Sequence, residues 1–202
     1  MADTVVEAKT TVLSPTAVRW TREDCEVFER TGLLKSRYEL VEGVINRFGQ
    51  NYAHGNMVRM LVAWLFALFG EDYVFSQTPI DFRPEDNPTS KPEPDAILLA
   101  CPANELTANP VPSDIRLLIE AADTTAANDL TTKAGLYARA GIAEYWVVVL
   151  PERSVYVHCQ PEDGAYTLVT KHLETEQVAT LAGSDRPVLI SQLLPPDTAG
   201  QL

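Results

Sequence analysis

Two acidic residues, Asp95 and Glu120, each stand at the end of a short apolar run that is typical of a buried strand. If these strands are neighbours in one sheet, both carboxylates reach one point, where their repulsion raises the pKa of one of them. A divalent cation removes that repulsion, and hard oxygen ligands suit Mg²⁺ or Mn²⁺. Such an ion lowers the pKa of a bound water and stabilises charge on a phosphoryl oxygen, so the pair predicts metal-assisted hydrolysis.

Lys133 follows Glu120 along the chain, about one turn into a predicted helix. From there its ammonium could orient an attacking water or stabilise a pentacovalent transition state. A structural alternative exists for each residue. Glu120 could form an ion pair with Lys133 or Arg116, and Asp95 could cap a turn after Pro94.

A strand–helix–strand unit must position these side chains. An apolar strand is predicted over Ile115 to Ala121, and a second over Glu144 to Leu150. Between them we expect a helix over Asp129 to Ala140, with Asn128 as its N-cap and Gly141 as its left-handed C-cap. This order favours a right-handed crossover between two parallel strands.

Other elements flank this unit on both sides in the sequence. A Thr-x-x-Asp capping pattern at Thr21 predicts a helix to about Arg30. Further predictions are a hairpin or a bent strand with a tight turn over Tyr38 to Phe48, a helix over Ala53 to Phe69, strands over Tyr73 to Phe82 and Asp95 to Ala100, and a second hairpin turning at residues 162–164.

The predicted helix Ala53 to Phe69 is apolar nearly all round, with polar residues only near its start. Such a helix is buried on two sides. It either lies inside the domain or covers a partner subunit, and the second possibility predicts a homodimer.

Length and composition predict one globular domain. The chain has 202 residues and an apolar share of 46%, which is ordinary for a folded protein. Residues 1–17 have no periodicity and are expected to form a mobile arm, with a single domain over residues 18–202. Three widely spaced cysteines without metal-ligand spacing indicate reduced thiols. With no secretory signal and no apolar run long enough to span a bilayer, we predict a cytoplasmic protein without membrane association.

The formal net charge of −12 limits the partners of the chain. DNA binds mainly through Lys and Arg, so this charge argues against strong non-specific nucleic-acid binding, while leaving room for a local basic cleft. Gln77, a polar residue in a predicted strand, either lines that cleft or faces solvent. Arg139 is the best basic candidate for a phosphate contact, with a solvated helix face as its alternative.

Five segments resemble the PD-(D/E)xK restriction-endonuclease-like superfamily, and within it a large bacterial group of uncharacterised biological role. The resemblance implies an α/β fold with a mixed central β-sheet flanked by helices and a core order of α-β-β-β-α-β. The segments are YELVEG at 38–43, SQTPI at 76–80, KPEPDAILL at 91–99, LLIEAADTT at 117–125 and DLTTKAGLYARAGIAEYWVV at 129–148.

The same resemblance implies the roles of individual residues. Asp95 and Glu120 match the motif acids that hold the metal, and Glu42 matches an acidic residue that often joins them. The usual lysine two residues after the glutamate is absent, because that position holds Ala122. In this group the lysine has moved to the following helix, which makes it Lys133.

Three functions follow from these residues. The first is an Mg²⁺- or Mn²⁺-dependent endonuclease that hydrolyses phosphodiester bonds of DNA. The second is an inactive nuclease-fold protein that acts by binding nucleic acid or protein, which the acidic charge and the displaced lysine favour. The third is glycoside hydrolysis by the Asp95–Glu120 pair, which the scarcity of aromatic residues in the neighbouring loops disfavours.

Overall fold

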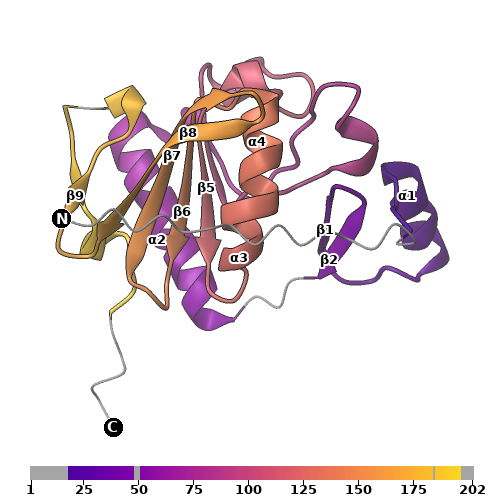
Figure 1. The fold of residues 1–202 in the computed structure, drawn as a ribbon, viewed down its shortest axis with the longest axis horizontal. Coiled ribbons are helices and arrows are strands. Elements are labelled where there is room, and N and C mark those ends of the chain that lie inside the picture. The colour runs from indigo at the N-terminus through magenta and orange to yellow at the C-terminus, as the bar shows by residue number, and fades with distance from the viewer. Residues whose placement is uncertain (1–17, 48–50, 184, 197–202) are drawn as a thin grey trace, which may run out of the picture.

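The computed structural model describes residues 18–47, 51–183 and 185–196 (Figure 1). The predicted arm at residues 1–17 lies outside the described residues, as do residues 197–202 at the end of the predicted domain and Phe48 at the end of the predicted hairpin.

A six-stranded mixed sheet in the order β3-β4-β5-β6-β7-β8 forms the centre of the fold (Figure 1). Strands β5 and β6 pair parallel, and the other neighbours pair antiparallel. A helix connects the parallel pair, as a parallel crossover requires. The strands are β3 Val74–Phe75, β4 Ala96–Leu99, β5 Ile115–Ala122, β6 Glu144–Val149, β7 Ser154–Glu162 and β8 Ala165–Leu173. The predicted fold class, with its α-β-β-β-α-β core, is confirmed.

Helices cover both faces of this sheet. Buried residues of α2 pack on one face with Trp146 of β6, whereas α4 packs on the other face through Leu136 and Tyr137. Both core clusters consist of fully buried apolar side chains, which is the main stabilising contribution to a fold of this kind. The helices are α1 Arg22–Thr31, α2 Tyr52–Phe69, α3 Ala126–Asn128, a π-helical turn Asp129–Lys133 and α4 Ala134–Ala140.

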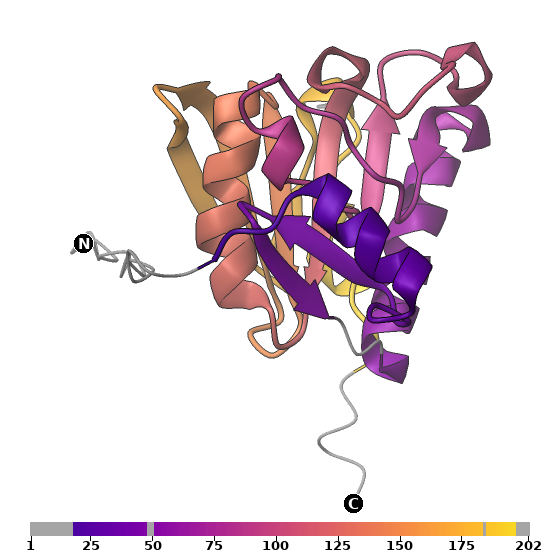
Figure 2. The ribbon, with the colours of Figure 1, turned by 90° about the vertical axis from the view of Figure 1, so that its right-hand side faces the viewer.

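A small unit made of α1 and the hairpin β1–β2 lies over the same face of the sheet as α4 (Figure 2). Thr21 and Asp24 form the predicted capping box at the start of α1. Strand β1, Tyr38–Val41, turns into β2, Val44–Arg47, through two residues with positive φ, Glu42 at 48° and Gly43 at 78°. Such a turn matches the twist of an antiparallel pair, so the predicted hairpin forms for the expected reason.

Short elements complete the chain. Strands β9 Gln177–Val178 and β10 Val188–Leu189 form a separate antiparallel pair. Single 3₁₀ turns lie at Glu71–Tyr73, Asn87–Thr89, Ala103–Glu105, Pro112–Asp114, Leu181–Gly183 and Ile190–Gln192.

The helix after β5 begins differently from its prediction. Gly141 closes α4 in the left-handed conformation at φ 82°, as expected. The assignment of Asn128 as N-cap is wrong, because helical backbone already begins at Ala126. A π-helical turn then accommodates Asp129 and Lys133, both of which are buried. The amphipathic pattern of the predicted helix places charged residues on its solvent face, so it did not predict that Asp129 and Lys133 are both buried.

The predicted strand Tyr73 to Phe82 is also shorter than expected. Only Val74 and Phe75 pair with β4. The chain leaves the sheet at Gln77, whose φ is 53°, and its N–H instead donates to the carbonyl of Pro94 at 2.9 Å. A left-handed residue interrupts the pleat, so this segment continues as a loop.

The C-terminal segment explains why α2 is apolar on more than one side. The side chain of Phe69 lies close to Gly183, and Arg186 stacks over the Phe69 ring at 5.6 Å while donating to the carbonyl of Leu68 at 3.0 Å. The larger apolar side chains from Val62 to Phe69 are therefore buried or half-buried within the chain. The predicted homodimer stays a prediction, but the apolar surface of this part of α2 is no longer an argument for it. Within the described residues, no helix combines the length and hydropathy needed to cross a bilayer.

Glu144 joins the start of β6 to the C-terminal segment. Its carboxylate accepts hydrogen bonds from Trp146 Nε1 at 2.8 Å and from the N–H of Leu181 at 2.8 Å. Burial raises the pKa of Glu144 to about 7, although both hydrogen bonds oppose this shift. The folded chain therefore holds a proton on Glu144 at pH values where the unfolded chain has already released it.

Stability is expected to fall as the pH rises from about 4.5 to 7, because the folded pKa of Glu144 lies above its unfolded value. At about 1.36 kcal/mol for each pKa unit, a shift from 4.5 to about 7 makes this proton account for roughly 3 kcal/mol over that range. Urea denaturation of wild type and Glu144→Gln at several pH values tests this, with the pH slope as the readout. Exposed Glu152, whose pKa the Lys171 hydrogen bond lowers, provides the control Glu152→Gln. Identical slopes for wild type and Glu144→Gln would contradict the prediction.

Candidate active site

A pocket of about 100 Å³ opens where the end of β5, the start of α2 and the π-helical turn meet. Sheet topology brings the two predicted acids there. Asp95 directly precedes β4, which runs antiparallel to β5, so Asp95 and Glu120 lie at the same edge of the sheet. The charged residues of the pocket that carry the argument are Glu39, His54, Asp95, Glu120, Asp129 and Lys133.

Asp95 is held by the backbone of β5. Its Oδ2 accepts a hydrogen bond from the N–H of Ala121 at 2.9 Å. Its Oδ1 has longer contacts, with His54 Nε2 at 3.4 Å and with Gln77 Nε2 at 3.5 Å. The hydrogen bond to Asp95 raises the pKa of His54. One carboxylate oxygen of Asp95 is thus fixed, while the other is weakly engaged and faces the pocket.

Glu120 and Lys133 form the buried centre of the site. Oε1 of Glu120 accepts from Lys133 Nζ at 3.0 Å and from the hydroxyl of Tyr137 at 2.9 Å. Lys133 also lies 2.7 Å from Glu39 Oε2 and 3.4 Å from Asp129 Oδ1. Only 2% of the Lys133 side chain is exposed, so its ammonium is fixed by three carboxylates rather than by water.

These carboxylates are themselves anchored by neighbouring segments. The second oxygen of Glu39, Oε1, accepts from the N–H of Glu93 at 2.7 Å. Asp129 Oδ2 accepts from the hydroxyl of Thr125 at 2.5 Å. Because β1, β5 and the π-helical turn each contribute one acid, the position of the Lys133 ammonium depends on all three segments.

Burial and like charge control the protonation of the cluster. Burial raises the pKa of Glu120 well above its usual value, Lys133 opposes the shift, and Glu39 and the other acids add to it. Burial likewise raises the pKa of Asp129. For Lys133, burial acts to lower the pKa, but the surrounding carboxylates outweigh it and raise the pKa well above the ordinary value. Lys133 is therefore charged, and the pocket contains more carboxyl groups than cationic side chains.

The donor set of the pocket fits a divalent cation. Within the residues that the structure describes, no three His, Cys, Asp or Glu side chains already converge as a complete metal site. However, Asp95 and Glu120 both line the pocket, and carboxylate oxygens are the ligands that Mg²⁺ and Mn²⁺ prefer, with water completing the shell. Burial is the main cause of the raised pKa of Glu120, and a cation would offset the further contribution of the neighbouring carboxylates. We therefore take Asp95 and Glu120 as the residues that would hold the ion.

Comparison with known proteins places this arrangement in a family. Residues 26–186 match the model of the Uma2 family, whose description is "putative restriction endonuclease". The chain belongs to the Uma2 family. The predicted resemblance to restriction-endonuclease-like proteins is thereby confirmed. A comparison with curated proteins finds no significant match.

A solved structure similar to this Uma2-family chain shares its fold. It is the crystal structure of a "putative nuclease belonging to DUF820" from Anabaena variabilis. The two have 13% sequence identity and a TM-score of 0.61, and the match covers 82% of this chain and 96% of that one. At this identity the likeness concerns the fold alone.

The structure brings together four of the residues selected from the sequence of the Uma2-family chain. Asp95, Glu120, Lys133 and Gln77 all line the pocket. Glu42 and Arg139 are not among its lining residues.

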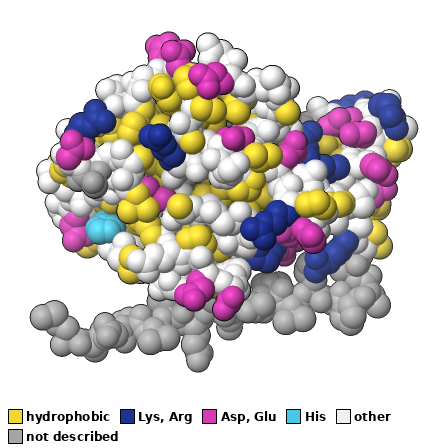
Figure 3. Space-filling model, turned by 90° about the horizontal axis from the view of Figure 1, so that it is seen from above, with side chains coloured by type: hydrophobic (Ala, Val, Ile, Leu, Met, Phe, Trp, Pro, Cys, Tyr) yellow, Lys and Arg dark blue, Asp and Glu magenta, His cyan; other side chains and the backbone are white. Residues whose placement is uncertain are grey.

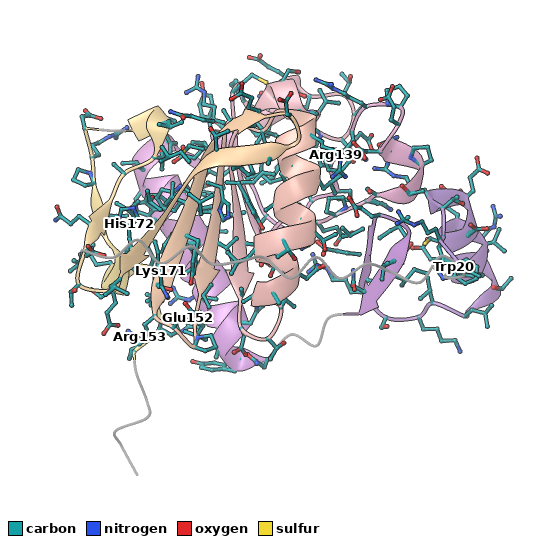
Figure 4. All side chains as sticks on the ribbon, in the orientation of Figure 1. Trp20, Arg139, Glu152, Arg153, Lys171 and His172 are labelled. Atoms are coloured by element: carbon teal, nitrogen blue, oxygen red, sulfur yellow. The ribbon has the colours of Figure 1, made fainter. Side chains whose placement is uncertain are left out.

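Glu42 and Arg139 lie at a different place in the fold. Glu42 occupies the β1–β2 turn, where its Oε1 lies 2.5 Å from Nη2 of Arg139, and Arg139 also lies 3.3 Å from Asp86. Figure 4 shows Arg139 on α4, pointing toward the loop that faces this helix. Through these contacts Arg139 ties the hairpin and Asp86 to α4.

Three pocket residues of the Uma2-family chain were missed by sequence reasoning. Glu39 was passed over for Glu42 in the same segment, although a charged residue inside an otherwise apolar strand was a usable signal. Asp129 was assigned to the helix terminus, whereas its spacing of four from Lys133 could have indicated the pair. His54 is one of the polar residues near the start of the predicted helix Ala53 to Phe69, and no local signal in the sequence indicates its contact with Asp95.

Proposed function

We propose that this chain is a nuclease that uses Mg²⁺ or Mn²⁺ to hydrolyse phosphodiester bonds in DNA. The observation that carries the proposal is the buried Lys133 ammonium, held 3.0 Å from Glu120 at the sheet edge where Asp95 also lies. A cation bound by Asp95 and Glu120 would activate water and neutralise charge on the phosphoryl oxygens. The names of the family and of its solved relative support the same reaction class.

The residues of the chain have separable tasks in this reaction. Lys133 presents a fixed positive charge that orients the attacking water or stabilises the charge that develops on the phosphorus oxygens. Glu39 and Asp129 hold that ammonium in place. Tyr137, which donates to Glu120, restricts the carboxylate to one orientation. Burial of the cluster strengthens each of these electrostatic contacts, because the effective dielectric constant inside a protein is low.

A second candidate is a catalytically inactive nuclease-fold protein that binds nucleic acid or another protein. It is favoured by one observation, namely that the described side chains do not already form a three-residue metal cluster. In that case Lys133 and its three carboxylates would serve only to hold β1, β5 and the helix together.

Plasmid cleavage distinguishes the two candidates. We expect wild type to nick supercoiled DNA with Mg²⁺ or Mn²⁺ and to lose this activity in EDTA, because the cation is part of the proposed chemistry. Glu120→Gln removes the charge of a proposed ligand and is expected to lower the rate at least about 100-fold. Glu152→Gln, an exposed acid paired with Lys171 on the surface (Figure 4), is the matched control and should cleave normally. Equal cleavage by all three proteins would indicate a contaminating nuclease, and no cleavage by wild type on double-stranded, single-stranded or RNA substrates would favour the second candidate.

A further inference from the structure

A second hollow, of about 140 Å³, adjoins the candidate active site. Arg37 and Glu93 line both spaces, so the two share a wall. On this measure a single water needs only ~10–15 Å³, so the hollow can accept a larger group. Its lining residues are Glu29, Ser36, Arg37, Tyr38, Lys91 and Glu93.

Arg37 is positioned at the shared wall by the acid opposite it. Its Nε and Nη2 both lie 2.9 Å from Oε2 of Glu93. The backbone N–H of Glu93 donates to Glu39, which contacts Lys133. One short chain of contacts therefore links Arg37 to the buried lysine. Arg37 uses only the Nε–Nη2 edge of its guanidinium on Glu93, and it also lines the hollow, so its other N–H groups can serve as donors there.

The hollow is lined by two acids, Glu29 and Glu93, and by two cations, Arg37 and Lys91, and the acids already have hydrogen-bond partners. Glu93 is engaged by Arg37, and Glu29 accepts from the hydroxyl of Tyr38 at 2.8 Å. Lys91 is fixed through its backbone N–H, which donates to Leu40, and its ammonium forms no ion pair with any residue that the structure describes. The hollow thus presents the ammonium of Lys91, one edge of the Arg37 guanidinium and the exposed hydroxyl of Ser36. Groups of these kinds bind phosphate in proteins.

The surroundings agree with this assignment. The active pocket itself is dominated by carboxylates, so a polyanionic strand needs its cationic contacts elsewhere. Seen from above, Lys and Arg side chains are more frequent on the side of the molecule where α1 and the β1–β2 hairpin lie (Figure 3). Arg37 and Lys91 flank this unit, next to the pocket.

We propose that the second hollow binds a phosphate of the substrate strand adjacent to the scissile one, with Arg37 and Lys91 as its ligands. This inference rests on the proposed nuclease function and specifies its substrate as a strand with more than one phosphate. A substrate with a single phosphodiester reaches the active pocket but has nothing to place in the hollow. Lys91, which lines only the second hollow, should therefore matter for an oligonucleotide and not for a dinucleoside monophosphate, and Arg37, which lines both spaces, should matter more for the oligonucleotide.

Two substrates and three variants test this subsite. Hydrolysis of a single-stranded 12-nucleotide DNA and of the dinucleotide TpT is measured with Mn²⁺ for Arg37→Ala, Lys91→Ala and Arg116→Ala. Arg116 is exposed at the opposite end of β5 and serves as the control for the loss of one positive charge. We expect Arg37→Ala and Lys91→Ala to raise KM for the 12-nucleotide strand about 10-fold with little change in kcat. Lys91 lines the second hollow and not the active pocket, so Lys91→Ala should leave TpT hydrolysis unchanged. Arg116→Ala should match wild type on both.

Salt dependence supplies the second measurement. Each phosphate contact on a single strand contributes a slope of about −0.7 to the plot of log affinity against log salt. Loss of Arg37 or Lys91 is expected to make the slope for the 12-nucleotide strand shallower by that amount. Unchanged KM and slope in both variants, or equal losses on TpT, would overturn the subsite while leaving the nuclease assignment standing.

Binding separates failure of the subsite from failure of the proposed function. If wild type binds the labelled strand in fluorescence anisotropy but hydrolyses nothing, the nuclease proposal fails, and the salt slope of Kd still decides the subsite. If wild type neither cuts nor binds the strand, both proposals are overturned.

Discussion

Replacing Lys133 by methionine is expected to lower the cleavage rate about 1000-fold and to destabilise the protein by roughly 3 kcal/mol at pH 8. Methionine preserves the unbranched shape but removes the charge that faces Glu39, Glu120 and Asp129. Three buried carboxylates would then lack their cation. Removing one partner of a buried ion cluster lowers the free energy of unfolding by more than the net contribution of the intact cluster, because the remaining charges stay buried without a partner.

The loss of stability should depend on pH in a defined direction. Burial raises the pKa of Glu120 and Asp129, so protonation relieves their repulsion as the pH falls. Urea denaturation at pH 5 and pH 8 should therefore show a smaller deficit at pH 5. Lys171→Met is the control, since this exposed lysine pairs with Glu152 on the surface (Figure 4), where an ion pair contributes at most about 1 kcal/mol. Full activity of Lys133→Met would remove this lysine from the proposed mechanism.

Asp95→Asn is expected to abolish tight Mn²⁺ binding and to lower cleavage at least about 100-fold, with a melting temperature within a few degrees of wild type. Asparagine is nearly isosteric, and its carbonyl oxygen can still accept the N–H of Ala121 that Asp95 now accepts at 2.9 Å. The change therefore removes the negative charge of a proposed ligand and retains the hydrogen bond that holds the segment to β5. Isothermal titration with Mn²⁺ and plasmid cleavage measure the two effects.

Asp114→Asn provides a matched control for this experiment. Asp114 also accepts a backbone N–H, from Val111 at 3.0 Å, but it lies at the other end of β5, outside the pocket. It should bind Mn²⁺ and cleave like wild type. If Asp95→Asn bound Mn²⁺ as wild type does, the cation would have to be held by other residues, and the pairing of Asp95 with Glu120 as metal ligands would be wrong.

The parts of the fold that depend on local chemistry could be predicted from the sequence. Thr21 with Asp24 capped α1, and Gly141 ended α4, because caps need only neighbouring residues. The parallel pairing of β5 and β6 followed from two apolar runs separated by a helix. Asp95 and Glu120 were found for the same reason, since an acid at the end of a buried strand is conspicuous in the sequence alone.

The remaining features depend on contacts between distant segments. Glu39 and Glu42 lie three residues apart in one hairpin, and the choice between them depends on how that hairpin docks on α4. The burial of Lys133 could not be inferred from its helix, because an isolated lysine in that pattern is usually solvated. The apolar surface of α2 is wide because the C-terminal segment also packs against the end of this helix. The sequence of that segment has little periodicity, so this contact could not be predicted.

The three carboxylates around Lys133 come from β1, β5 and the π-helical turn, which are separated by long stretches of chain. A partly folded molecule in which the α1–β2 unit has not docked would keep its central sheet but would lack Glu39 beside the lysine. Lys133 would then be held by two carboxylates instead of three, so the proposed cleavage would depend on the docking of this unit as well as on the residues of the sheet.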